Sequence, residues 1–416
     1  AFGLLSDRST SRFGRRRPYI LLGVLLDLAF LAAMALSLNY WMLLASVLLL
    51  QFSANISHGA LQGLIPDLAP EDQKGRASAF KAVFELLAII LVALSIARIA
   101  GAGQIEWAIA ATAGALLLIM LLTMILVREE PLREKPDTPL GPPMLRVLGM
   151  LVGLLVGAVV GLVVGGLVGG LAALIAWPLA GADTAMMVLV ALGGTVAMAV
   201  AAVVGVWVGA LITLGQDARR HASFTWWIVN RLLFLAAVTS IQAFAAFFLM
   251  SSLGMTREAA VEMAGGLMMI VGLCTLVAAL PSGWLADRFG TKRLVGAGAL
   301  IAMAGTAVLV MTRPFPSVPL IYVGGAIVGI GAGLFMTSNW ALGTELAPRE
   351  KAGHYLGVSN LAGAGAGVVG ASLGGLIADF IDGYQPGLGH FVIFGSYGVL
   401  FVLSAVSLLG VRGESE

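Results

Sequence analysis

The chain has 416 residues, of which 59% are hydrophobic and 11% charged, and its mean hydropathy of +0.99 excludes a soluble globular protein. The formal net charge of +2 gives no basic surface for nucleic acid, so we expect no nucleic-acid partner. A single cysteine, Cys274, excludes an intramolecular disulfide, and the four histidines lie in separate segments. We therefore expect neither a metal site nor a cofactor.

Apolar runs follow one another along the whole chain, and each is close to the roughly 20 residues that a helix needs to cross a bilayer. No segment between them is long enough for a soluble domain. The sequence therefore predicts an all-α polytopic membrane protein with twelve helices, at residues 18–38, 41–65, 79–100, 107–127, 147–178, 184–212, 225–252, 260–285, 294–312, 318–344, 355–380 and 390–411.

The distribution of Lys and Arg predicts the orientation. If the opening segment is cytoplasmic, alternating sides leave only Arg98, Arg257 and Arg313 near the outer face. The remaining basic residues then face the anionic inner leaflet. We expect an integral protein of the cell (inner or plasma) membrane, in contact with lipid, with both chain ends cytoplasmic.

Two motifs occur twice at nearly one offset. GLLSDRSTSRFGRRR (3–17) matches GWLADRFGTKR (283–293) and aligns Asp7 with Asp287. DLAPEDQKG (67–75) matches ELAPREKAG (345–353) and aligns Asp67 with Glu345. Two expected helices separate the motifs in both copies, so the pattern predicts parallel repeated halves of a transporter.

The repeat also predicts the domain organisation. Two expected helices precede the second GWLADR-type motif and none precedes the first, so we expect that two N-terminal helices are absent from this sequence. The pair at 147–212 is then an insertion, and a complete chain would have fourteen helices. The expected parts are an N-terminal half lacking its first two helices (1–127), a cytoplasmic linker (128–146), two Gly-rich inserted helices (147–212) and a C-terminal six-helix half (225–411).

The repeated G-x-x-x-D-R followed by basic residues resembles the signature loop of the major facilitator superfamily. The longer first copy, with LIPDLAPEDQKGRAS (64–78), is similar to the glycoside-pentoside-hexuronide cation symporters and the related sucrose-proton symporters. This resemblance implies the major facilitator fold and a non-enzymatic secondary transporter. The implied activity is alternating-access symport of a sugar or glycoside with a proton or sodium ion.

Two departures keep other functions open. Inserted central helices are more familiar in fourteen-helix drug-proton antiporters, and the fourth-helix acid of many sugar symporters is replaced by uncharged polar residues. A drug or metabolite exporter, and a non-transporting pigment-handling or assembly relative, are therefore alternatives. A Met- and Phe-lined cavity would favour export of drugs, whereas hydroxyl-binding groups around His58 would favour a sugar.

The repeated loops predict a cytoplasmic gate that latches reversibly. We expect the two aligned aspartates to cap helix N-termini or pair with arginines, the basic clusters to pair with Asp67 and Glu345, and the glycines to allow tight turns. Control of topology and lipid binding are the alternative explanation. The full set is Gly3, Asp7, Arg8, Gly14, Arg15, Arg16, Arg17, Asp67, Gly283, Asp287, Arg288, Gly290, Lys292, Arg293 and Glu345.

A polar stripe marks the expected helix 41–65, with side chains spaced by four, three and four residues on one helical face. It predicts substrate contacts in a water-filled cavity, with interhelical hydrogen bonding as the alternative. The equivalent helices of the other half supply weaker candidates, among which Trp340 aligns with Gln62. The substrate candidates are Gln51, Asn55, His58, Gln62, Asn230, Gln242, Asn339 and Trp340.

Proton coupling needs a buried acid, because burial favours the neutral form and allows titration. Asp27 lies roughly 14 Å into its helix and is the preferred candidate. Glu85 is the second, although an ion pair with Lys81 four residues earlier also explains it. Arg231 is shallow, and we expect its side chain to extend to the cytoplasmic surface.

Small residues repeat every four positions in the inserted pair, at Gly153, Gly157, Gly161, Gly165 and Gly169 and at Gly193, Ala197, Ala201, Gly205 and Gly209. This spacing predicts close packing of the two helices on each other or on the bundle edge, with oligomerisation as a weaker alternative.

Overall fold

A computed structural model describes residues 9, 11, 14, 16–61, 64, 68, 84, 87–88, 91–92, 95–127, 129, 141–347, 358–359, 362–363 and 365–411. Across these residues the regular structure is helical, and no strand occurs. The chain forms two compact units, Ala1–Leu145 and Arg146–Glu416. The observed division falls inside the predicted linker, and the finer domain boundaries stay predictions.

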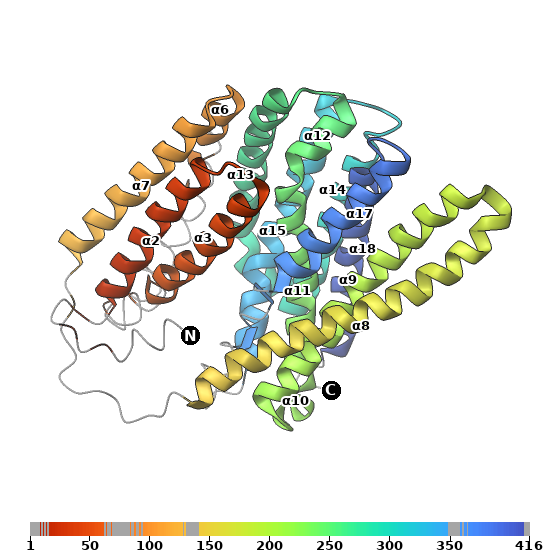
Figure 1. The fold of residues 1–416 in the computed structure, drawn as a ribbon. Helices are drawn as coiled ribbons and strands as arrows, with labels where there is room; N and C mark the ends of the chain where they lie inside the picture. Colours follow the sequence, from red (N-terminus) through yellow and green to blue (C-terminus); the bar gives the residue numbers. More distant parts are fainter. Residues whose placement is uncertain are drawn as a thin grey trace. The chain divides into compact units, whose positions relative to one another are not determined.

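The first unit contains α2 (Arg17–Ala35), α3 (Tyr40–Leu61), the short α6 (Ile96–Gly101) and α7 (Ile105–Leu126) (Figure 1). Pro18 occupies the first turn of α2, where its missing N–H costs no hydrogen bond. The helices α2 and α3 touch closely at Gly23, where an added Cβ would lie 2.6 Å from the Ser57 backbone nitrogen. Only glycine allows this approach, and it brings the polar residues of the two helices together.

The second unit is built around α11 (Ala222–Ala243), the central helix of its bundle, in which 83% of the candidate membrane span is buried. Phe244 separates α11 from α12 (Ala245–Leu253) within one predicted apolar run. The other helices labelled in Figure 1 are α10 (Asp217–Arg220), α13 (Arg257–Phe289), α14 (Thr291–Val310), α15 (Val318–Leu346), α17 (Leu373–Tyr384) and α18 (Gly389–Ser407). Two short elements complete the unit, the π-helix η3 (Gly367–Ser372) before α17 and the 3₁₀ turn η4 (Leu408–Gly410) after α18.

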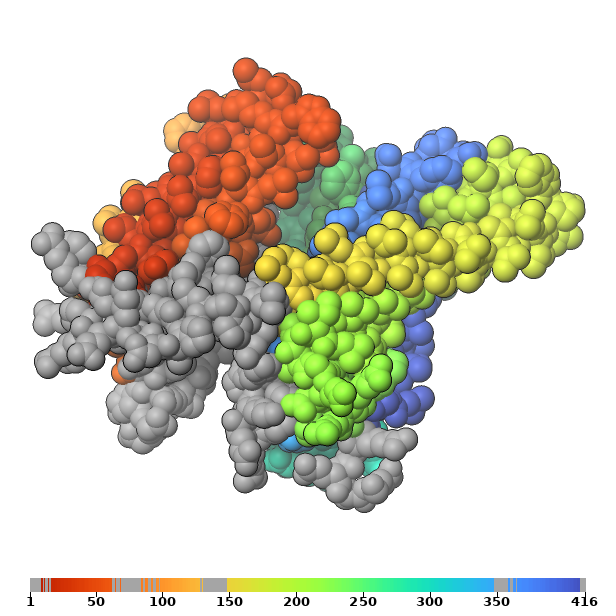
Figure 2. Space-filling view, turned by 60° about the horizontal axis from the view of Figure 1, so that its bottom comes forward, coloured from red at the N-terminus to blue at the C-terminus, as the bar shows by residue number. Residues whose placement is uncertain are grey.

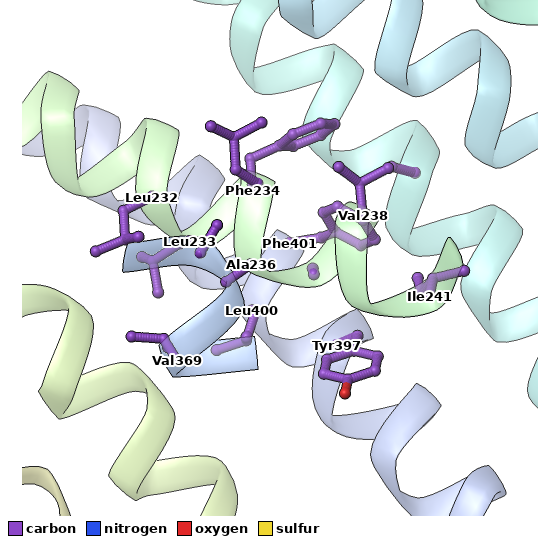
Figure 3. Close-up of a cluster of buried hydrophobic side chains, with 14 of the residues drawn as sticks. Leu232, Leu233, Phe234, Ala236, Val238, Ile241, Val369, Tyr397, Leu400 and Phe401 are labelled. Carbon is purple, nitrogen blue, oxygen red and sulfur yellow. The ribbon is translucent and has the colours of Figure 1, made fainter. Parts of the chain in front are cut away.

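Stacked aromatic rings hold the centre of this bundle together. Phe234 of α11 lies parallel to Phe335 of α15 with ring centroids 3.6 Å apart, and Phe401 of α18 packs 5.0 Å from Phe234 (Figure 3). The Tyr397 hydroxyl donates to the Gly370 carbonyl oxygen at 3.1 Å, within the π-helix. This dense packing makes the bundle interior apolar, so each polar group within it needs a specific partner.

The inserted pair forms a long hairpin of α8 (Gly141–Ala180) and α9 (Ala182–Leu214), joined at Gly181, whose φ is +85°. The predicted close packing of the two helices is confirmed. A Cβ at Gly157 would lie 2.5 Å from the Ala201 carbonyl oxygen, and one at Gly165 would lie 2.2 Å from that of Gly193. Backbones at this separation gain many dispersion contacts, which drive helix association where water is absent.

The hairpin attaches to the bundle through α9. Thr195 and Ser396 of α18 share a hydrogen bond of 2.7 Å, and Trp207 packs edge-on against Trp226 with ring centroids 6.0 Å apart. Figures 1 and 2 show the turn of the hairpin projecting beyond the rest of the second unit. The hairpin therefore lies on the flank of the bundle, as the Gly-rich pattern predicts.

Ten of the described helices are long and apolar enough to span a membrane, and the all-α polytopic fold is confirmed. Half of the expected run 79–100 lies outside the described residues. The run 355–380 contains η3, which interrupts regular α-helix, and it also includes residues outside the description. The chain is an integral membrane protein.

Candidate functional site

A buried polar cluster links α11, α15 and α18 at one end of the second unit. Asn339 donates through Nδ2 to Asn230 Oδ1 at 2.7 Å, and Asn230 donates through Nδ2 to the Ser404 carbonyl oxygen at 2.7 Å. The Ser404 hydroxyl donates in turn to the Asn230 carbonyl oxygen at 2.9 Å. All three residues are fully buried. Because their polar groups satisfy one another, the cluster fixes the relative positions of the three helices.

Arg231 lies beside this cluster and is held by it. Its Nη1 donates to Asn339 Oδ1 at 3.1 Å, and its guanidinium carbon lies 5.2 Å from the Trp340 ring centroid and 5.8 Å from that of Trp227. Trp227 is fully buried and donates through Nε1 to the Asn339 carbonyl oxygen at 2.8 Å, whereas Trp340 is 46% exposed. Two indoles and one amide therefore define the direction of the guanidinium.

This arrangement corrects the expectation that Arg231 extends to the membrane surface. Its side chain instead turns toward α15, because the indoles and the Asn339 oxygen offer partners that the apolar surroundings lack. Within the described ranges, no Asp or Glu side chain lies within 4.0 Å of the guanidinium.

The predicted substrate residues of the second unit separate into two kinds. Asn230 and Asn339 are fully buried and use their amides on each other, so in this conformation they position Arg231 and do not line a cavity. Trp340 and Gln242 are exposed. Sequence reasoning placed all four on the correct helices, but periodicity alone does not show which amides meet across a helix interface.

Gln242 lines a small apolar pocket farther along α11. Phe248, Met268, Val328 and Phe394 are among the other lining residues, and the described residues contribute only apolar atoms to the pocket surface. Along α11, Phe234 lies between Arg231 and the pocket residues. Along α15, its stacking partner Phe335 lies between Asn339, which contacts Arg231, and the pocket residue Val328. The pocket therefore forms a second, separate feature of the bundle interior.

In the first unit, the polar stripe of α3 places Gln51, Asn55 and His58 at exposed positions, as the spacing predicts. Asn55 donates through Nδ2 to the Gln51 carbonyl oxygen at 2.7 Å, which directs this amide along its own helix. Gln62 lies outside the described residues. A substrate contact by this stripe stays a prediction.

Asp27 is buried between α2 and α3, with 4% of its surface exposed. Its Oδ1 accepts a hydrogen bond from the Ser53 hydroxyl. In the described part of the chain no Lys, Arg or His side chain lies within 4.0 Å of its carboxyl group. A buried acid with a hydroxyl partner and no cation beside it is suited to carry a proton. Glu85, the other acid expected to couple protons, lies outside the description.

The first gate motif surrounds a carboxylate that the sequence analysis missed. Glu129 Oε2 accepts from the backbone N–H groups of Arg16 at 2.8 Å and Arg17 at 3.1 Å, and so caps the N-terminus of α2. Gly14 has φ of +103°, and a Cβ there would lie 2.7 Å from the same oxygen. The turn glycine is therefore confirmed at this position. The position of Glu129 directly after the apolar run 107–127 was the sequence feature that could have indicated this capping role.

Arg17 of the first motif contacts the end of α7. Arg17 donates through Nη2 to the Met124 carbonyl oxygen at the end of α7, a contact with a backbone carbonyl and not with an acid. The remaining members of the expected gate, Gly3, Asp7, Arg8, Arg15 and Asp67, lie outside the described residues.

The second motif continues α13 to Phe289, so Gly283 lies inside a helix and its expected role in a turn is wrong. Gly290, with φ of +89°, makes the turn and is confirmed. Glu345 Oε1 accepts from the Thr291 hydroxyl at 3.0 Å, while Lys292 donates through Nζ to the Val411 carbonyl oxygen at 2.5 Å.

The expected ion pairs of Lys292 and Arg293 with Glu345 are therefore not formed in this conformation. The Glu345 carboxylate accepts instead from the hydroxyl of Thr291, the first residue of α14. Arg288 lies over the Trp284 ring at 5.5 Å. Asp287 and Arg293 are exposed and make no hydrogen bond or ion pair with a described residue. The gate itself stays a proposal.

Replacing Glu129 with Ala should expose the first turn of α2, because two backbone N–H groups lose their acceptor. A lost cap costs about 1 kcal/mol, so amide exchange over residues 16–24 should become about fivefold faster. Hydrogen–deuterium exchange with mass spectrometry measures this change.

The matched control is E106A, which removes an exposed acid from the first turn of α7. Equal exchange of the α2 segment in E129A and E106A would contradict the capping role.

Comparison with known proteins assigns the family. The family model described as Major Facilitator Superfamily matches residues 1–216 and 232–415. The chain belongs to the major facilitator superfamily. This membership identifies a membrane transporter, of a family that is generally non-enzymatic.

Individual relatives match only part of this facilitator, and at low sequence identity. "Multidrug resistance protein MdtG" of Enterobacter lignolyticus (strain SCF1) is 29% identical over 200 residues, which cover 48% of this chain and 44% of the relative. The protein of the same name from Salmonella choleraesuis (strain SC-B67) is 28% identical over 196 residues, covering 47% and 45%. Each match thus includes less than half of the relative.

Solved structures confirm the facilitator fold. A POT family transporter in complex with a thioalcohol-conjugated peptide has a TM-score of 0.65 at 16% identity, covering 98% of this chain and 83% of that one. A POT family transporter in complex with 5-aminolevulinic acid has a TM-score of 0.63 at 17% identity, with the same two coverages.

Proposed function

We propose that this facilitator exports small lipophilic compounds in exchange for protons. The apolar pocket beside α11 carries the proposal. Its lining includes Phe248, Met268 and Phe394, and only apolar atoms form its surface. Apolar pockets with few polar groups suit compounds that present aromatic or aliphatic surface, and methionine adapts its shape to different ligands. A sugar would leave most of its hydroxyl groups without partners there.

Three further observations support export. Relatives that match about half of the chain are named multidrug resistance proteins. The Gly-rich pair α8 and α9 is the feature of the sequence that resembles fourteen-helix drug-proton antiporters. Asp27 supplies a buried acid for proton exchange, which accepts a hydrogen bond from Ser53.

Filling the pocket tests the proposal. V328F should lower proton-driven transport of a fluorescent aromatic dye such as fluorescein by at least about tenfold in proteoliposomes, since a ring in the pocket removes a site worth more than about 1.4 kcal/mol. I330F adds the same ring at an exposed position of the same helix and should transport at the unmodified rate. Equal dye transport by V328F and the unmodified protein would refute the pocket as the site.

Symport of a sugar or glycoside with a cation is the second candidate, and the exposed Gln51, Asn55 and His58 on α3 favour it. Uptake of a radiolabelled sugar panel, with and without an imposed proton gradient, separates the two functions. Gradient-dependent sugar uptake without dye transport would replace export by symport. Binding of pigments without transport of either class would indicate the assembly relative.

A further inference from the structure

Arg231 combines features of an anion site that the proposed export function does not yet use. It is a cation within the bundle, and its only hydrogen bond to a described residue uses Nη1. Nε and Nη2 donate to none of the described residues. Placing a guanidinium in an apolar region without a counter-charge is unfavourable. One amide oxygen and two indole faces compensate for only part of this cost.

The surroundings of Arg231 are built so that one edge of the guanidinium stays available. Asn339 accepts from Nη1, and Asn230 in turn holds Asn339 by accepting from its Nδ2. Ser404 completes this chain by accepting from Asn230. These fully buried residues position Arg231 without neutralising it. A planar fork with a free edge fits the two oxygens of a carboxylate or phosphate.

Trp340 adds the second element of the site. Its indole is 46% exposed and lies 5.2 Å from the guanidinium carbon of Arg231. A ligand whose acid group reaches the free guanidinium edge would therefore place its adjoining atoms over an aromatic surface. Flat apolar groups pack well on such a ring.

We propose that Arg231 binds the acid group, carboxylate or phosphate, of an amphipathic organic anion whose flat apolar part packs on Trp340. This inference deepens the proposed export function by naming the substrate class. The apolar pocket lies farther along the same α11–α15 contact, about 10 Å from Arg231 at 1.5 Å per helical residue. A long apolar body reaches it only when the Phe234–Phe335 stack opens.

Matched aromatic probes test the acid site directly by binding to the purified protein. The probes are 1-naphthoate, 1-naphthyl phosphate and the neutral 1-naphthamide, measured by isothermal titration in detergent. We expect both anions to bind about tenfold more tightly than the amide, because charge-assisted hydrogen bonds contribute more than neutral ones. R231Q should abolish this preference. R257Q, which removes an exposed arginine at the start of α13, should retain it.

Two further variants keep the test decisive. R231K preserves the charge but loses the planar fork, so the preference for the anions should fall to below about threefold. W340A should weaken all three probes while the preference for the anions remains. Equal binding of naphthoate and naphthamide, or an unchanged preference in R231Q, would overturn the proposal.

The acid group could belong to a soluble compound or to a lipid headgroup, and nanodiscs distinguish these sources. If it is soluble, naphthoate binds equally in discs of phosphatidylcholine alone and in discs that also contain phosphatidylglycerol. If it is a headgroup, phosphatidylglycerol competes with naphthoate. I330F, at an exposed position of α15, should leave naphthoate binding unchanged. Failure of dye export with intact anion selectivity would refute only the export proposal.

Discussion

Replacing Asp27 with Asn should reduce transport driven by a proton gradient to the level of protein-free liposomes, while exchange of substrate across the membrane continues. The amide has nearly the shape of the carboxyl group, and its oxygen can still accept from the Ser53 hydroxyl. The contact between α2 and α3 is thereby preserved. What the variant loses is the proton-binding group, so only the coupled step should fail. Proteoliposome flux with and without an imposed pH difference measures both rates.

Two controls separate proton coupling from general damage. D183N neutralises an exposed acid in the first turn of α9 and should leave both rates unchanged. S53A removes the hydroxyl partner but keeps the acid, so it should shift the pH dependence of driven transport without abolishing it. Driven transport at the full rate in D27N would exclude Asp27 as the coupling residue.

Replacing Gly165 with Ala should destabilise the protein by roughly 1–3 kcal/mol, the usual cost of overpacking a close contact. The added Cβ would lie 2.2 Å from the Gly193 carbonyl oxygen and 2.8 Å from the Ala197 Cβ. Both neighbours belong to α9, and one is backbone, so the helices must separate to make room. A lower midpoint in thermal unfolding of the purified protein measures the loss.

The neighbouring glycine provides a closely matched control. A Cβ at Gly166 meets nothing within 4 Å. G166A should therefore stabilise by up to about 1 kcal/mol, since Ala has the higher helix propensity. Similar midpoints for G165A and G166A would show that the close approach of α8 and α9 contributes little to stability.

Much of the fold was predictable because membrane-spanning helices are defined by local composition. The apolar runs at 18–38, 107–127 and 294–312 match α2, α7 and α14 within a few residues at each end. The glycines repeated every four residues in 147–178 likewise predict that this helix packs on the helix at 184–212. Close approach of two helix backbones needs small residues on both helices, and both segments have them. Both are properties of one or two segments and need no knowledge of distant contacts.

The candidate site was only partly predictable. Sequence spacing selected Asn230 and Asn339, but it could not show that they bond to each other and direct Arg231 toward Trp340. The capping of α2 by Glu129 joins residues more than a hundred positions apart, and no periodic pattern records it. Charge pairing inferred from repeated motifs also misassigned Lys292, whose nearest acceptor is a carbonyl at the chain's far end.

The amino-acid sequence was enough to identify a helical membrane transporter of the major facilitator type, and it predicts a Gly-rich helix pair between two halves. Hydropathy, charge asymmetry and repeated loops suffice for this, because the bilayer imposes the same length and polarity on every spanning segment. Which polar groups satisfy one another became visible only in the three-dimensional structure. That outcome depends on side chains from separate helices meeting at hydrogen-bond distance, which helix packing alone establishes.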